Sequence, residues 1–249
     1  MPLATRIIPV LLKRGTDLVK GVRFDSSRIV GHALQAARIH QARGVDELMV
    51  IDVGATPAGN GPDFASVEKL TKDCFVPLTI GGGIRSVEDI RDLLNAGADR
   101  VLIETAAMHN PGLISDAAAK VGSQAIVVSV SYTRGFATSH CGTMLHTIGA
   151  LEAAEQAVAL GAGEILLQSI DLDGTMKGYD TGTLYAVAKN VPVPVIASCG
   201  AGEYMHMLSA INCGANAVAA GAMFQFTDQT PMEAAAYLAK NGVEVRIPA

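Results

Sequence analysis

The sequence predicts a (β/α)8 barrel built from two similar halves, and three observations support this fold class. The chain has 249 residues, close to the roughly 250 that are typical of such barrels. A glycine-rich strand-to-helix unit occurs twice, as PLTIGGGIRSVEDIRDLLNAGADRVLI from Pro77 and as PVIASCGAGEYMHMLSAINCGANAVAA from Pro194, 117 positions later. The composition, with 49% hydrophobic residues, 4% aromatic residues and no Trp, is typical of aliphatic strands buried on both faces.

The repeat extends into the other quarters of the chain. The segment GVDELMVID matches GAGEILLQSID, which places Glu47 opposite Glu164. The opening RIIPVLLKRG matches QAIVVSVSYTRG, with Leu12 opposite Ser131. Two long copies favour a closed barrel over a solenoid, which is assembled from many short repeats.

We expect one domain over residues 1–249, with half-barrels at about 1–120 and 121–249. Eight apolar runs predict the strands, near residues 6–12, 47–52, 76–80, 100–103, 124–131, 164–168, 194–198 and 217–220. Helical spacing between them predicts helices over 30–43, 86–96, 112–120, 147–160, 181–188, 203–213 and 232–240. An open doubly wound sheet is the competing fold, but it does not need a two-fold internal repeat.

Composition excludes several classes of protein. The net charge of -5 comes without a basic run, so we expect neither nucleic acid nor an anionic membrane surface as a partner. The four cysteines form no C-x-x-C pair, which predicts free thiols in a reducing compartment, and we expect no metal or other cofactor. The first apolar run is too short for a signal peptide and no stretch approaches 18 apolar residues, so we expect a cytoplasmic protein.

Glycines at the ends of predicted strands form two candidate anion sites. The first cup contains Gly82 and Gly83 of the sequence IGGGI, and the second is built around Gly200 in SCGAG. Side-chain-free positions before a helix let backbone N–H groups approach a phosphate. Two cups at one barrel mouth favour a substrate with two phosphate ends, whereas the alternative is that the glycines only make tight turns. The second cup also includes Gly174, Gly221 and Ala222.

Acidic residues at strand ends are candidates for proton transfer. Asp52 follows the apolar run MVI, and Asp171 and Asp173 lie in SIDLDGT. Carboxylates at the carboxyl ends of barrel strands serve as general acids or bases. The alternative for Asp171 and Asp173 is that they cap a turn. We expect the six histidines to be surface residues on helices or loops, namely His32, His40, His109, His140, His146 and His206.

Four charged residues lie near the beginnings of predicted strands, at the opposite end of the barrel. Arg6 and Arg100 alternate with Glu47 and Glu164. Two cations and two acids at such positions predict an ion-paired ring that closes the barrel bottom. The ring is either a stabilising network or a functional gate.

These motifs, in order along nearly the whole chain, resemble the cyclase subunit of imidazole glycerol phosphate synthase, the HisF family of histidine biosynthesis. The resemblance rests on RIIPVLL, GVDELMVID, TIGGGIRSVEDI, GADRVLIETAA, GSQAIVVSV, GAGEILLQSIDLDGTMKGYD, PVIASCGAG and NGVEVR. It implies a duplicated barrel that binds a substrate with two phosphates. It also implies a glutaminase subunit docked at the bottom and ammonia passing through the barrel. The four charged residues then match the family's gate, with Arg100 in place of a lysine.

The sequence departs from this family where its catalytic residues are expected. The family's two catalytic aspartates end the first and fifth strands, and the matching residues are Leu12 and Ser131. Leucine transfers no proton, and serine needs a partner to do so. Glu104 lies in the first cup where the family commonly has asparagine, beside the retained Thr105, and Cys199 lies in the second cup. This pattern resembles the glycosyl amidation-associated WbuZ type of paralogue.

Three hypotheses follow. The first is a barrel subunit that docks a glutaminase and channels ammonia to an N-acetyl sugar amidotransferase of surface polysaccharide (O-antigen) biosynthesis, and it has no confidently assigned catalytic residue of its own. The second is a true cyclase in which Asp52, Asp171 or Asp173 transfers the protons. The third is a catalytically idle barrel that only recognises a sugar nucleotide or scaffolds a complex. In each case we expect a phosphorylated small molecule as a ligand.

Overall fold

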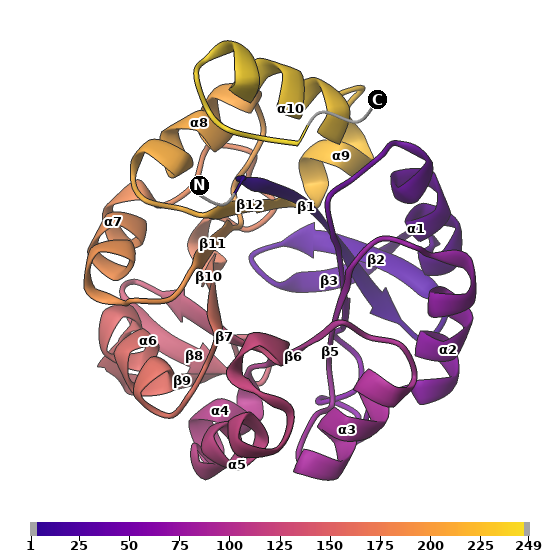
Figure 1. The fold of residues 1–249 in the computed structure, drawn as a ribbon, viewed down its shortest axis with the longest axis vertical. Coiled ribbons are helices and arrows are strands. Elements are labelled where there is room, and N and C mark those ends of the chain that lie inside the picture. Colours follow the sequence, from indigo (N-terminus) through magenta and orange to yellow (C-terminus); the bar gives the residue numbers. More distant parts are fainter. Residues whose placement is uncertain (1–3, 247–249) are drawn as a thin grey trace.

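A computed structural model, which describes residues 4–246, confirms the closed parallel barrel (Figure 1). Eight parallel strands pair in a circle, and β1 closes it by pairing with both β12 and β4. The barrel strands are β1 (Arg6–Arg14), β4 (Leu48–Asp52), β5 (Leu78–Gly81), β6 (Arg100–Ile103), β7 (Ile126–Thr133), β10 (Glu164–Ser169), β11 (Val195–Ser198) and β12 (Ala217–Ala220). Each predicted strand is therefore present, with bounds that differ by a few residues.

Helices surround the barrel on its outside (Figure 1). Local sequence signals fix several of their ends: Ser86 and Asp89 form a capping box at the start of α3, and Thr230 and Glu233 form another at α10. Such boxes satisfy the free N–H groups of a first helical turn. The long helices are α1 (Ala33–Ala42), α2 (Phe64–Asp73), α3 (Val87–Asn95), α5 (Gly112–Val121), α6 (Ala150–Ala159), α7 (Thr181–Asn190), α8 (Tyr204–Asn212) and α10 (Pro231–Lys240).

Two antiparallel hairpins were not predicted from the sequence. They are β2 (Asp17–Val22) with β3 (Asp25–His32), and β8 (Phe136–Ser139) with β9 (Met144–Gly149). The predicted helices 30–43 and 147–160 are wrong at their beginnings, because residues 30–32 belong to β3 and 147–149 to β9. These residues are extended because they pair with the hairpin strand before them. Helix α2 was also missed, although Asp63 caps it by accepting the N–H of Ser66.

The hairpins and two short helices make the internal repeat visible in three dimensions. Each hairpin extends the strand that opens a half-barrel, since β2 pairs with β1 and β8 pairs with β7. The short helices α4 (Thr105–His109) and α9 (Ala222–Phe226) lie 117 positions apart, as the two sequence units do. The repeat thus includes the loops at the strand ends.

The inside of the barrel is a separate apolar layer. This layer separates the two ends of the barrel. We call the end where the strands begin the lower face and the end where they finish the upper face. Filling of the interior by branched side chains is typical of this fold. No helix within residues 4–246 is long and apolar enough to cross a lipid bilayer. The layer consists of Ile8, Val10, Met49, Leu102, Val127, Leu166, Ile196, Ala217 and Ala219.

Candidate functional site

The four charged residues predicted at the lower face do form a closed ring. Arg6 Nη1 lies 2.7 Å from Glu47 Oε2, and Arg100 Nη1 lies 2.8 Å from the same oxygen. Arg100 Nη1 is also 3.2 Å from Glu164 Oε2, and Arg6 Nη2 pairs with Glu164 Oε1. Each arginine therefore contacts both glutamates. Because the ring lies directly below the apolar layer, it covers the lower end of the barrel axis.

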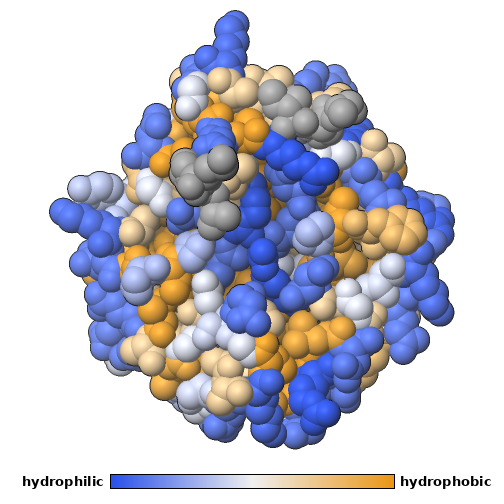
Figure 2. Space-filling view, viewed as in Figure 1, coloured by the Kyte–Doolittle hydropathy of each residue, from blue (hydrophilic) through white to orange (hydrophobic). Residues whose placement is uncertain are grey.

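Burial is unequal within the ring. The glutamate side chains are 2% and 8% exposed, whereas those of Arg6 and Arg100 are 23% and 28% exposed. Burial alone disfavours the charge on Arg6, but attraction to Glu164 and Glu47 is larger in sum and raises its pKa. Figure 2 shows hydrophilic residues gathered around the centre of the lower face. The arginines are thus the members of the ring that a molecule approaching from this side meets.

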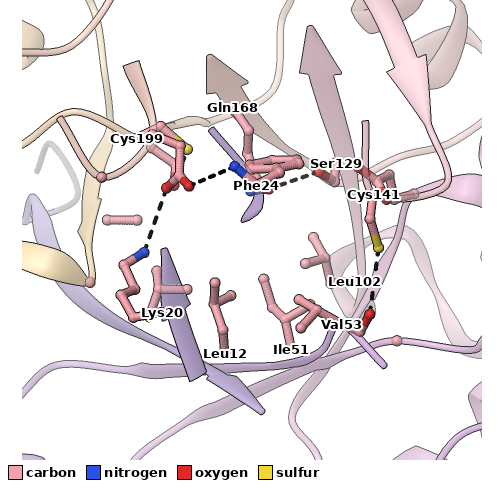
Figure 3. Close-up of a pocket in the computed structure, with 18 of the residues that line it drawn as sticks. Leu12, Lys20, Phe24, Ile51, Val53, Leu102, Ser129, Cys141, Gln168 and Cys199 are labelled. Atoms are coloured by element: carbon pink, nitrogen blue, oxygen red, sulfur yellow. Dashed lines mark hydrogen bonds and ion pairs between the residues drawn. The ribbon is translucent and has the colours of Figure 1, made fainter. Parts of the chain in front are cut away.

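The main cavity lies at the upper face and encloses about 110 Å³. Figure 3 shows apolar Leu12, Ile51 and Leu102 along one side, with Cys199 and Gln168 on the opposite side. All seven residues predicted for the two anion cups line it, namely Gly82, Gly83, Thr105, Gly174, Gly200, Gly221 and Ala222. The structure therefore brings the loops of both half-barrels to one cavity.

Glycine is required at two positions of the cups because neighbouring backbone atoms lie too close to leave room for a side chain. A Cβ at Gly82, where φ is +111°, would lie 2.4 Å from the carbonyl oxygen of Asp52. A Cβ at Gly200, where φ is +105°, would lie 2.0 Å from the carbonyl oxygen of Gly178. Neither position has room for a side chain, and both have a φ that other residues rarely adopt. The tight-turn interpretation and the anion-site interpretation are thus compatible at these positions.

The acidic candidates separate into two groups. Asp52 lines the cavity and pairs with Lys13 at 3.0 Å, and its Oδ1 accepts the N–H of Gly54 at 2.9 Å. Asp173 also lines the cavity, 3.5 Å from Lys20 Nζ. Both of these candidate carboxylates are therefore already paired with a buried lysine.

Asp171 has a different position. It is not among the residues that line the cavity. Its carboxylate accepts the N–H of Arg134 and the hydroxyl of Thr133, both at 2.8 Å. The backbone hydrogen bond from Arg134 is the largest cause of its lowered pKa. Asp171 thus holds the distant β7–β8 turn and not a turn of its own loop.

Neither Leu12 nor Ser131, the residues at which the sequence resemblance implies catalytic aspartates, provides a free acid or base. Leu12 lines the cavity with its aliphatic side chain. Ser131 is buried and donates its hydroxyl to Glu104 Oε1. Burial raises the pKa of Glu104, although hydrogen bonds from Ser131 and from the backbone of Cys141 oppose the rise. Glu104 is therefore the carboxyl group that lies nearest to the fifth-strand position.

Several cavity residues were not predicted from the sequence. Ser129 donates to Gln168 at 3.2 Å, and Lys20 reaches the cavity from the hairpin strand β2. The period of two along β7 would have placed Ser129 on the same inner face as Ser131. For Lys20 no such signal was available, because the hairpin itself was missed.

The histidine prediction is wrong for His40. This residue is buried, its Nδ1 has no hydrogen-bond partner, and burial lowers its pKa to about 4. Three others converge on the buried hydroxyl of Ser139: His146 Nε2 at 2.9 Å, and His109 Nε2 and His140 Nδ1 at 3.2 Å.

Within residues 4–246, no group of three or more His, Cys, Asp or Glu side chains is arranged to hold a metal ion.

The fold and the site together define the class. The chain is a (β/α)8 barrel protein whose upper cavity is formed by matching glycine loops of two half-barrels, with a charged ring at the opposite end. The model of the family described as "Histidine biosynthesis protein" matches residues 6–230. The chain belongs to this family, which confirms the broad assignment to histidine-biosynthesis barrels made from the ordered motifs.

Proposed function

We propose that the protein is a barrel subunit that docks a glutaminase at its lower face and conducts ammonia along its axis. The ammonia serves an N-acetyl sugar amidotransferase in surface polysaccharide biosynthesis. The observation that carries the proposal is the closed ring of Arg6, Glu47, Arg100 and Glu164 over the axis, combined with Leu12 at a catalytic position of the upper cavity.

The interior of the barrel suits a small neutral molecule. Above the ring, Ile8, Met49 and Leu166 are fully buried and have no hydrogen-bonding group that would retain ammonia. Ammonium ions are disfavoured there because a charge in an apolar interior is strongly destabilised. The more exposed members of the ring are its arginines, so a docked partner that offers them carboxylates would draw them aside and open the axis.

The upper cavity lacks a free acid or base at the two positions where the resemblance implies the cyclase would need one. A ring-closing reaction needs positioned acids and bases, each of which contributes typically about 10²- to 10⁴-fold. Leu12 has no titratable group, and the hydroxyl of Ser131 is committed to Glu104. The proposal therefore assigns the chain the transfer of ammonia rather than the chemistry of imidazole formation.

The test is stimulation of glutaminase activity. The full chain is mixed with a class I glutaminase of the type that the family resemblance implies and with glutamine, and glutamate release is measured. We expect stimulation by the wild-type chain and by an Arg38→Gln control, whose pair with Asp73 is on the surface. An Arg6→Ala, Arg100→Ala double variant is expected to stimulate less. Absence of stimulation by the wild-type chain contradicts the proposal.

The second candidate is the true cyclase subunit. It is favoured by the seven cup residues, which all line one cavity together with Asp52 and Asp173. Growth of a histidine auxotroph that lacks its own cyclase subunit, when it carries this chain, would support the cyclase. Failure to grow, with the chain expressed, contradicts the cyclase.

A further inference from the structure

The internal repeat relates the two ends of the upper cavity, and it identifies equivalent residues in them. Leu12 of β1 pairs with Val19 of β2, and Ser131 of β7 pairs with Thr138 of β8. The next residues along the hairpins, Lys20 and Ser139, are therefore equivalent. In the same way Glu104 and Gly221 are equivalent, because each immediately precedes one of the short helices α4 and α9.

The second cup carries a buried positive charge. Lys20 is 4% exposed, and its Nζ lies 3.1 Å from the point where a Cβ at Gly221 would be. The ammonium thus lies against bare backbone that faces the cavity. Its distance of 3.5 Å from Asp173 Oδ1 is longer than the roughly 2.7–2.9 Å of a charge-assisted hydrogen bond. The other oxygen of Asp173 accepts the N–H of Phe24. Lys20 therefore retains capacity to bind an anion beside Gly221.

The thiol in this cup does not add a negative charge. Burial raises the pKa of Cys199, and the neighbouring carboxylate of Asp173 raises it further. A neutral thiol does not repel a phosphate. The second cup thus combines the ammonium of Lys20 and the carboxylate of Asp173 with the close backbone of Gly174 and Gly200.

The first cup has the opposite character. At the position of Lys20 it has Ser139, whose hydroxyl is engaged by three histidines. At the position of Gly221 it has Glu104, which accepts the hydroxyl of Ser131. Among the cavity-lining residues of the described chain, Lys20 is the one lysine or arginine. The first cup thus presents a carboxyl group to the cavity and lacks the matching cation.

We infer that the upper cavity binds a ligand with a single phosphate end, held in the second cup by Lys20, and that an uncharged, hydroxyl-rich end lies in the first cup against Glu104. A sugar 1-phosphate or a sugar nucleotide has this chemistry. A carboxyl group hydrogen-bonds sugar hydroxyls in either protonation state, and in its ionised form it repels a second phosphate. This inference goes beyond the proposed function, which assigns no ligand to the upper cavity.

The first experiment counts bound phosphates. Inorganic phosphate is titrated into the full chain by calorimetry, with one site per chain expected. Lys20→Met is expected to weaken this site at least tenfold, and Glu104→Gln is expected to gain a second site. Lys189→Met is the matched control, because Lys189 lies over the Tyr185 ring on α7, outside the cavity. Urea unfolding checks that each variant is folded.

The second experiment compares ligands with one and two phosphates. Wild-type protein is expected to bind fructose 1,6-bisphosphate no more than about threefold more tightly than glucose 1-phosphate, whereas Glu104→Gln is expected to prefer the bisphosphate at least tenfold. The inference is overturned if the wild type binds two phosphates or none, if Lys20→Met keeps the site, or if Glu104→Gln gains neither a site nor the preference. No glutaminase is present, so these results stand apart from the test of docking.

Discussion

The substitution Glu47→Gln tests whether the lower ring stabilises the fold. Glu47 Oε2 accepts from Arg6 at 2.7 Å and from Arg100 at 2.8 Å, and Oε1 accepts from Thr79 at 2.6 Å. Glutamine keeps the shape of the side chain but removes its charge. A hydrogen bond to a charged group is worth about 1.5–3 kcal/mol and a neutral one about 0.5–1.5 kcal/mol. Weakening the two arginine bonds therefore costs about 2–3 kcal/mol.

Thermal and urea unfolding at pH 7 measure this cost. In a domain of this size about 1 kcal/mol changes Tm by roughly 2–4 °C, so Glu47→Gln is expected to lower Tm by roughly 4–12 °C. The control Arg38→Gln removes a surface pair whose side chains are 55% and 37% exposed, and it is expected to change stability by less than about 0.5 kcal/mol. A Glu47→Gln variant as stable as the control would refute the assignment of a stabilising role to the ring.

Three other substitutions have definite expected outcomes. Leu166→Ala empties part of the barrel interior, where this side chain is fully buried, and is expected to cost about 2–5 kcal/mol in urea unfolding. Gly82→Ala places a Cβ 2.4 Å from a carbonyl oxygen at positive φ, so we expect a loss of at least about 1 kcal/mol. His40→Gln is expected to flatten the dependence of stability on pH, because the pKa of buried His40 is lowered to about 4 from an unfolded value near 6.5.

The sign of the His40 effect follows from proton uptake. Between pH 6.5 and pH 4 the unfolded chain binds a proton at His40 that the folded chain does not, so wild-type stability falls as pH decreases through this window. From the lowered pKa of about 4, the loss between pH 7 and pH 5 is about 2 kcal/mol. Urea midpoints at the two pH values measure it. An equal loss in wild type and His40→Gln would show that other groups cause the pH dependence.

The barrel strands were predictable because strands buried on both faces are nearly continuous apolar runs. The hairpins were not, because their exposed strands mix polar and apolar residues and are stabilised by pairing with the ends of β1 and β7. The segment MLHTIG of β9, for example, has exposed Met144 and Leu145. A segment of this mixed composition is compatible with a helix or with a strand. Pairing with a neighbouring strand in the folded barrel determines which of the two forms.

Residues of the site were predictable from the sequence at positions that only one residue type can occupy. Gly82 and Gly200 were found because only glycine fits beside the carbonyl oxygens of Asp52 and Gly178. Contacts such as Ser131 with Glu104, or Lys20 with Asp173, join residues far apart in the chain. Their partners depend on which side chains the barrel brings to the same end, and no local pattern in the sequence specifies this.

The differences between the two halves, rather than their similarity, determine the charge at both ends of the barrel. Glu47 and Glu164 occupy equivalent positions in the two halves. Both ring arginines, in contrast, come from the first half, and the second half has alanine at the two matching positions. Four arginines would leave the ring with an unbalanced positive charge, whereas two balance the glutamates. At the upper cavity, Lys20 likewise has no cationic counterpart in the other half. The lower end of the barrel is thus neutral and closed, and the upper cavity has an ammonium at one end only, because each of these cations is present in only one half.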